Sequence, residues 1–176
     1  MKLLVNVVLL AFLTANCVPS EKTSDLKEFS SEDAGFKISL PCSPQLTRKD
    51  EYPYKAGKRY GYDFECNSAE KKIKLSFGDH NPDSGETTEK FLEYSKGDIE
   101  FALRDSNKER REMTIDGHPG YRYIITYKNG AHSIVYLAAN NKGIFHLMIG
   151  PFLGSEHSTA YEEESDQIIN TFHFLK

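Results

Sequence analysis

The amino-acid sequence predicts an α+β protein in which helices pack on an antiparallel β-sheet of about six to seven strands. The first observation is the stretch 118–150, where three runs rich in tyrosine, isoleucine and leucine follow one another with short polar breaks. One break is Asn129-Gly130, and Asn-Gly between two strand-like runs is the strongest short-range signal of a β-hairpin. The second observation is a pair of segments, beginning near residues 84 and 159, whose apolar residues recur with the period of an α-helix.

The polar breaks also predict how these three strands pair. A two-residue turn at the first break places Tyr127 opposite His132. A second turn at 141–142 places Tyr136 opposite Leu147. Apolar residues then line both faces, whereas an antiparallel sheet with one wet face alternates cleanly between apolar and polar residues. We therefore expect both faces of this part of the sheet to be covered.

Three further segments, at 35–40, 59–66 and 71–77, show strand-like alternation. We also expect a short, charged strand at 108–115, and 171–175 is a candidate for a last, short strand. The stretch 48–58 is polar and rich in turn-forming residues, so it is predicted to be an exposed loop. Charges of both signs fill 108–115, which is typical of an edge strand protected against pairing with other chains.

The two helices are defined by their apolar stripes. In the first helix, at 84–103, the stripe is Phe91, Leu92, Ser95, Ile99, Ala102 and Leu103. Gly97 lies inside this helix and costs about 1 kcal/mol relative to alanine. In the second helix, Thr159 and Glu162 fit a capping box. Its stripe is Tyr161, Ser165, Ile168, Ile169 and Phe172.

The N-terminus has the features of an export signal. In residues 1–16, Lys2 precedes an apolar core that is too short to span a bilayer. The segment 13–17 resembles a bacterial lipobox, so we expect a signal peptide over 1–16 and a lipid, with palmitate, on Cys17. The alternative is an ordinary cleaved signal followed by an incidental cysteine.

The rest of the chain is long enough for one domain. Residues 17–33 are polar, so we expect the lipidated cysteine to be followed by a flexible tether. Residues 34–176 then form a single domain. The whole chain has a net charge of −4 at pH 7, which argues against nucleic acid as a partner.

The sequence contains three cysteines, and an odd number in an exported protein calls for an explanation. Lipidation of Cys17 leaves Cys42 and Cys66. An oxidising compartment favours a disulfide between these two residues. The alternative is a pair of buried free thiols.

Three short motifs mark the beginning, middle and end of the expected domain. They are Gly-Phe-Lys-Ile-Ser-Leu-Pro-Cys-Ser-Pro at 35–44, Asp-Gly-His-Pro-Gly at 116–120 and Ile-Ile-Asn-Thr-Phe-His-Phe at 168–174. Together they resemble motifs of small exported bacterial lipoproteins with a PsbP-like α/β/α sandwich domain. The resemblance implies this fold for residues 34–176. It implies no active site, because that family includes many uncharacterised lipoproteins with no shared active site.

The sequence shows little that indicates chemistry. The segment 79–83 offers one histidine and several oxygen ligands, but it lacks the features of a calcium loop or a zinc site. We therefore expect no metal and no cofactor. No nucleophile elbow or phosphate-binding glycine loop is present, so no catalytic residues are predicted. Tyr52 and Tyr54, in the expected loop 48–58, are candidate ligand contacts.

These observations predict a non-enzymatic cell-envelope protein that is anchored to a bacterial membrane through Cys17, on the periplasmic side or the cell surface. Its expected role is to bind another protein or to act as an accessory factor. The alternative is a small-ligand-binding envelope protein with a pocket between sheet and helix, near Tyr52 and Tyr54.

Overall fold

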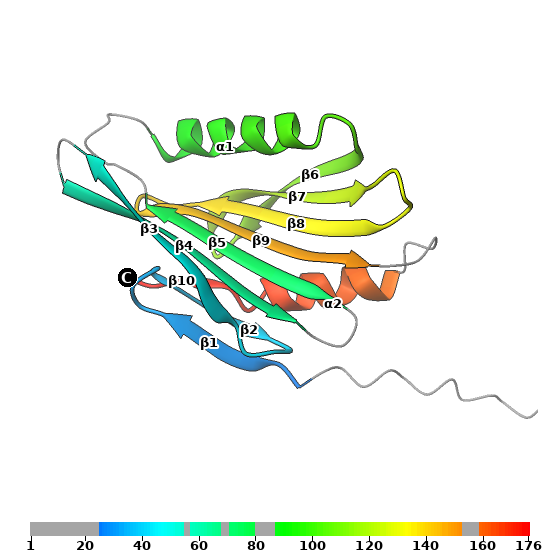
Figure 1. Cartoon of the computed structure of the whole chain (residues 1–176), viewed down its shortest axis with the longest axis horizontal. Helices are drawn as coiled ribbons and strands as arrows, with labels where there is room; N and C mark the ends of the chain where they lie inside the picture. Colours follow the sequence, from blue (N-terminus) through cyan, green and yellow to red (C-terminus); the bar gives the residue numbers. More distant parts are fainter. Residues whose placement is uncertain (1–24, 55–56, 68–70, 80–86, 153–158) are drawn as a thin grey trace, which may run out of the picture.

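The structure is a computed structural model that describes residues 25–54, 57–67, 71–79, 87–152 and 159–176 (Figure 1). Its elements form three layers. Helix α1 (Thr88–Ala102) covers one face of a large sheet, while helix α2 (Thr159–Ile169) and a small sheet cover the other face. The α+β sandwich predicted from the sequence is confirmed.

The large sheet has seven antiparallel strands in the order β3-β4-β5-β9-β8-β7-β6. They are β3 (Gln45–Tyr54), β4 (Gly57–Asn67), β5 (Lys72–Asp79), β6 (Asn107–Ile115), β7 (His118–Thr126), β8 (His132–Ala139) and β9 (Gly143–Phe152). The small sheet has the order β1-β2-β10, with β1 (Lys27–Ser31), β2 (Phe36–Leu40) and β10 (His173–Phe174). Within the described ranges, no helix is long and apolar enough to cross a membrane.

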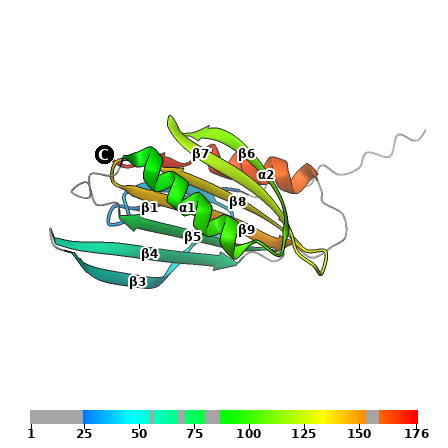
Figure 2. The same ribbon diagram turned by 90° about the horizontal axis from the view of Figure 1, so that it is seen from above.

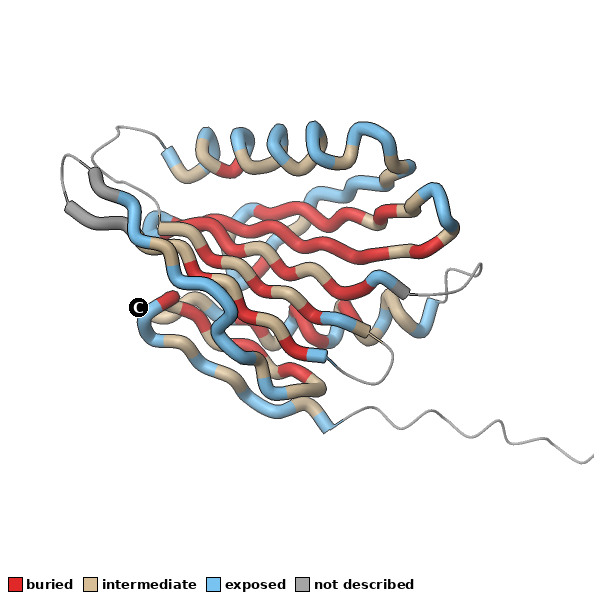
Figure 3. The backbone as a smooth tube through the Cα atoms, in the orientation of Figure 1, coloured by how far each residue is buried: buried red, intermediate tan, exposed pale blue. Residues whose placement is uncertain are grey.

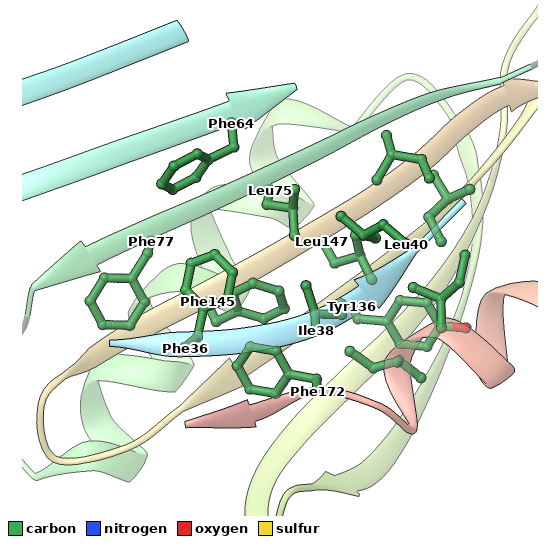
Figure 4. Close-up of a cluster of buried hydrophobic side chains, with 14 of the residues drawn as sticks. Phe36, Ile38, Leu40, Phe64, Leu75, Phe77, Tyr136, Phe145, Leu147 and Phe172 are labelled. Carbon is green, nitrogen blue, oxygen red and sulfur yellow. The ribbon is translucent and has the colours of Figure 1, made fainter. Parts of the chain in front are cut away.

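The main core lies between the large sheet and the layer formed by α2 and the small sheet (Figure 4). Strand β2 contributes Phe36, Ile38 and Leu40, which are all fully buried because alternate side chains of a strand point to the same face. The ring centre of Phe145 lies 5.1 Å from that of Phe36 and 4.0 Å from that of Phe172. These aromatic contacts anchor the small sheet and the segment that follows α2 to the large sheet.

A second core lies under α1. Leu92 of the helix is buried and belongs to the same cluster as Tyr123 of β7 and Leu137 of β8. The helix runs across β8 and β9 and leaves β3 and β4 outside its cover (Figure 2). Residues 133–139 of β8 are all buried (Figure 3). The expectation that both faces of the central strands are covered is therefore correct.

The hairpin between β7 and β8 differs from the predicted two-residue turn. Its loop has three residues, closed by a hydrogen bond of 2.9 Å from the Tyr127 N–H to the Ala131 carbonyl. Gly130 has a φ of +79°, as the last residue of such a loop requires. Thr126 therefore lies opposite His132, and the prediction for Tyr127 is wrong by one residue. A shift of one residue turns every β7 side chain to the other face, so the β7 tyrosines face α1.

Two stretches that were expected to be irregular are strands. Strand β1 lies within 17–33, so the prediction of a flexible tether is wrong for its last part. It is ordered because Phe29 packs against Phe64 and Phe36, with ring centres 5.2 and 6.0 Å apart. The stretch 48–58, predicted to be a loop, forms most of β3 and the start of β4. The polar composition hid both strands, because backbone pairing needs few apolar side chains.

Candidate partner-binding surface

Helix α1 is fixed at both of its ends. The side-chain oxygen of the N-cap Thr87 accepts a hydrogen bond of 3.3 Å from the Lys90 N–H. At the other end, Nζ of Lys108 in β6 donates to the carbonyl oxygens of Glu100 and Leu103, at 3.3 and 3.5 Å. A cation at this end also complements the helix dipole. The orientation of α1 on the sheet is thereby set.

A hydrogen bond and an ion pair hold one flank of α1 against the sheet. Glu93 accepts hydrogen bonds from Lys96 and from the hydroxyl of Tyr121 in β7, and these bonds hold the pKa of Glu93 below its ordinary value. Arg110 of β6 donates to Glu100 at 2.6 Å. The charged groups on this flank are therefore engaged within the chain, and the outer face of the helix is a separate surface.

That outer face carries an aromatic stripe, which we define as Tyr94, Gly97 and Phe101. Spacings of three and four residues place the three on one line along the helix. Tyr94 is 52% exposed and Phe101 is 70% exposed. Covering the Phe101 side chain would contribute about 2–3 kcal/mol to binding. Two aromatic side chains on one rigid helix face are therefore available as interface anchors.

The stripe has a notch in its middle and a cation at each end. A Cβ atom added at Gly97 would find no heavy atom within 4 Å, so the space between the two rings is open. Nζ of Lys90 lies 5.8 Å from the ring centre of Tyr94, and the guanidinium carbon of Arg104 lies 4.6 Å from that of Phe101. These distances fit cation–π contacts, which keep each cation beside its ring.

A shallow cavity of about 510 Å³, largely open to solvent, lies beyond the C-terminal end of α1, between the α1–β6 connection and the β7–β8 hairpin. Its lining residues are Asp105, Ser106, Tyr127, Lys128, Asn129, Ala131 and Pro151. The size suits a small molecule, and the lining combines one aromatic ring with groups of both charges. It lies away from the residues that sequence reasoning had selected.

Those residues, Tyr52 and Tyr54, belong to strand β3 rather than to a loop. Tyr52 is half-exposed, donates a hydrogen bond of 2.9 Å to Asp50 and lies against the backbone of Gly61. The side chain of Tyr54 lies outside the described residues, as does Cys17. The cavity does not include Tyr52, and a ligand contact by Tyr52 or Tyr54 stays a prediction.

The structure contains the expected disulfide between Cys42 and Cys66, with Cα atoms 5.9 Å apart. Among the described residues, no three His, Cys, Asp or Glu side chains form a group that could hold a metal ion. His173 lies 2.8 Å from Asp116, but the same carboxylate also accepts the Phe174 N–H at 2.8 Å. Burial acts to raise the pKa of Asp116, and these hydrogen bonds outweigh it and lower the pKa. The pair therefore fastens β10 to the β6–β7 turn.

Sequence reasoning missed the aromatic stripe because it followed the buried face of α1. The signal was available: Tyr94 and Phe101 are seven residues apart, which is two helical turns, on the side opposite to Leu92. It also missed the buried guanidinium of Arg122, which pairs with α2. No local pattern distinguishes that arginine from the exposed arginines of β6.

Comparison with known proteins supports the architecture. The sequence matches no known family model. No curated protein is a significant relative. Among solved structures, the fold is similar to the solution structure of cyanobacterial PsbP (CyanoP) from Synechocystis sp. PCC 6803, with a TM-score of 0.51 and 12% sequence identity. The similarity covers 92% of this chain and 98% of that chain, so it shows a PsbP-like fold.

Proposed function

We propose that this protein is a non-enzymatic, lipid-anchored accessory protein of the bacterial cell envelope, and that it binds another protein through the aromatic stripe. The observation that carries the proposal is the 70% exposure of Phe101 on a helix that is otherwise fixed to the sheet. Aromatic side chains held on rigid elements are typical interface anchors, because they bury a large area and lose little conformational entropy.

The stripe favours a partner of defined chemistry. Gly97 leaves room for one aliphatic side chain between the two rings. Lys90 and Arg104, one at each end, favour carboxylates on either side of that side chain. The partner is therefore an amphipathic protein segment with a central aliphatic residue and flanking acidic residues.

Two features support a non-enzymatic role. The described histidine–carboxylate pair, His173 with Asp116, holds β10 in place. The main core is formed by apolar side chains, and the polar group of Tyr136 within it is bonded to α2. The His173–Asp116 pair and the core with its Tyr136 hydrogen bond both stabilise the fold.

The proposal is tested by placing a photo-crosslinking amino acid at Phe101 of the full chain in the native cell. Irradiation should give one discrete protein adduct, identified by mass spectrometry. The matched control is the same amino acid at Glu163, an exposed position on α2. Arg104→Glu, combined with the crosslinker at Phe101, should abolish the adduct by repelling the acidic partner. No protein adduct from Phe101, or equal adducts from Phe101 and Glu163, would refute the proposal.

The lipid anchor is tested separately. Cys17→Ser should release the protein from membranes and leave the precursor unprocessed, because the cysteine sulfur is the attachment point of the lipid. Fractionation and intact mass measure both effects. A variant with the same fractionation and processing as the wild-type chain would show that Cys17 is not lipidated.

The cavity favours a second candidate function, the binding of a small ligand. Lys128 and Asp105 carry opposite charges at this cavity, so a ligand with both charges, such as an amino acid, suits it. Such a ligand would raise the melting temperature of the chain. Lys128→Ala should remove that increase, whereas Lys142→Ala, at an exposed residue outside the cavity lining, should not. A screen of free amino acids without any thermal shift would exclude this candidate.

A further inference from the structure

Strand β6 forms one free edge of the large sheet. It pairs with β7 on one side, and the strand order ends there. Residues 109–112, in the middle of the strand, are exposed on both faces of the sheet. Alternate backbone N–H and carbonyl groups of an edge strand point away from its neighbour and are available for pairing with another chain. The charged side chains of β6 protect this edge against unspecific pairing, so only a chain with complementary charges fits.

The charges of β6 fall into two groups. Lys108 and Arg110 are engaged with α1, through the Glu100 and Leu103 carbonyls and the Glu100 carboxylate. Glu109 and Arg111 are exposed and form no ion pair with any residue that the structure describes. The same holds for Glu112. These three charges therefore remain available for a partner.

The order of the charges along β6 is self-complementary. The strand reads Lys108-Glu109-Arg110-Arg111-Glu112. In an antiparallel pair of identical strands, a two-fold axis at Arg110 sets Lys108 opposite Glu112 of the second copy and Glu109 opposite Arg111 of the second copy. Opposite charges at facing positions stabilise a pair of strands, and like charges destabilise it. Symmetry repeats each pair, which gives complementary pairs on both faces.

Other registers are less favourable. An axis at Glu109 would set Lys108 opposite Arg110, which are like charges. An axis at Arg111 would leave Arg110 opposite Glu112 as the one complementary pair. The axis at Arg110 sets this residue opposite Arg110 of the second copy. In each copy the Glu100 carboxylate lies 2.6 Å from the Arg110 guanidinium and neutralises its charge.

The other free edge of the large sheet, β3, does not offer this complementarity. Arg48 pairs with Asp50 in the same strand, and Lys49 pairs with Asp33 at 3.1 Å. The pairing of β3 with β4 is also irregular between Leu46 and Arg48. The charges of β3 are thus satisfied within the chain, whereas those of β6 are not.

We propose that two copies of this protein associate through β6, antiparallel and with the two-fold axis at Arg110, so that the two large sheets become one continuous sheet. The interface consists of backbone hydrogen bonds between the two β6 strands and of two symmetry-related Glu109–Arg111 ion pairs, while Glu112 lies opposite Lys108, whose Nζ stays bonded to α1. This association is independent of the aromatic stripe, which lies on the outer face of α1.

The position of the axis is tested by cysteine crosslinking in the full chain with Cys17→Ser. Facing Cα atoms of antiparallel strands are about 4.5–5.5 Å apart, within the range that a disulfide spans. Arg110→Cys faces itself across the axis and should give a dimer on a non-reducing gel that disappears on reduction. Arg111→Cys faces residue 109 of the second copy and should stay monomeric. No dimer from Arg110→Cys, or equal dimer from both variants, would overturn the proposed register.

The ion pairs are tested by charge exchange, with the dissociation constant of the dimer measured by sedimentation. Glu109→Arg sets two arginines opposite each other on both sides of the axis, so it should weaken the dimer about tenfold. The double variant Glu109→Arg with Arg111→Glu restores opposite charges and should recover the wild-type constant. A wild-type chain that stays monomeric, a single variant with unchanged affinity, or a double variant that is not restored would each refute the proposal. Circular dichroism and melting temperature confirm that all variants fold.

Discussion

The hydroxyl of Tyr136, in the middle of the large sheet, lies 2.6 Å from Oδ1 of Asp166 on α2 and donates a hydrogen bond to it. The same carboxylate oxygen lies 3.1 Å from Nε of Arg122, whose Nη2 donates to Glu162 at 2.5 Å. Burial and the bond to Asp166 raise the pKa of Tyr136, so its hydroxyl stays protonated and remains a donor. A polar cluster, placed beside the apolar core, thus sets the position of α2.

Tyr136→Phe tests this cluster. The variant loses one charge-assisted hydrogen bond, while Asp166 keeps its ion pair with Arg122. We expect the free energy of unfolding to fall by about 1–2 kcal/mol in denaturant titrations. Tyr94→Phe removes an exposed hydroxyl and should change stability by less than about 0.5 kcal/mol. Equal effects of the two changes would show that the Tyr136 hydroxyl does not stabilise the docking of α2.

The disulfide connects two layers of the molecule. Cys42 follows β2 of the small sheet, and Cys66 lies in β4 of the large sheet. Replacing both by alanine should lower the free energy of unfolding by roughly 2–5 kcal/mol. Because the bridge joins the two sheets, hydrogen exchange should increase first in β1 and β2. Increased exchange confined to β6 and β7 would contradict this account.

Much of the fold could be predicted from the sequence because hydrophobic periodicity reports burial. The pairing of Tyr136 with Leu147 follows from the predicted turn at 141–142, and the buried stripe of α2 follows from the helical period. The register of β7 could not be predicted. Asn129-Gly130 is compatible with both a two-residue and a three-residue hairpin loop. Which loop length forms depends on how the β7 side chains pack under α1.

The candidate surface was harder to predict than the fold. A stripe such as Tyr94 and Phe101 becomes informative only when the opposite face of α1 is known to be buried. The pairing of Arg122 with α2 depends on contacts between residues forty positions apart in the sequence. Side-chain contacts between residues far apart in the sequence leave no local sequence pattern. The burial of alternate residues in β2 does leave such a pattern.

Two glycines should respond in opposite ways to alanine. A Cβ atom at Gly143 would overlap the carbonyl oxygen of Gly78 and lie 2.5 Å from the ring of Phe77. Gly143→Ala should therefore destabilise the protein by about 1–3 kcal/mol. Gly97 has open space around it, so Gly97→Ala should stabilise α1 by about 0.5–1 kcal/mol. Thermal unfolding distinguishes the two, and a destabilised Gly97→Ala variant would contradict the described environment of α1.

Gly97→Leu separates stability from binding. Its side chain fills the notch between the two rings of the aromatic stripe. We expect the crosslink from Phe101 to fall at least about tenfold, since an aliphatic anchor worth 1.5–3 kcal/mol is excluded. The melting temperature should not fall. Undiminished crosslinking would show that the partner does not enter the notch.

We predict that protonation of His146 in β9 lowers the stability of the protein in mild acid. It lies on the α1 side of the large sheet, between Ser76 and Leu137 in the strand register. Desolvation lowers its pKa from 6.5 to about 4, and the carboxylates of Asp63 in β4 and Asp98 in α1 oppose this shift only weakly. The unfolded chain therefore binds the proton more tightly than the folded chain.

Stability from neutral His146 is fully present above pH 6.5 and is lost as the pH falls toward 4. Because the side chain is partly exposed, we expect a loss of about 1–2 kcal/mol, less than the full pKa difference allows. His146→Gln cannot take up this proton, so its free energy of unfolding should change less over the same interval. Denaturant titrations at several pH values compare the two chains. Parallel pH profiles for wild type and His146→Gln would show that His146 is not the titrating group.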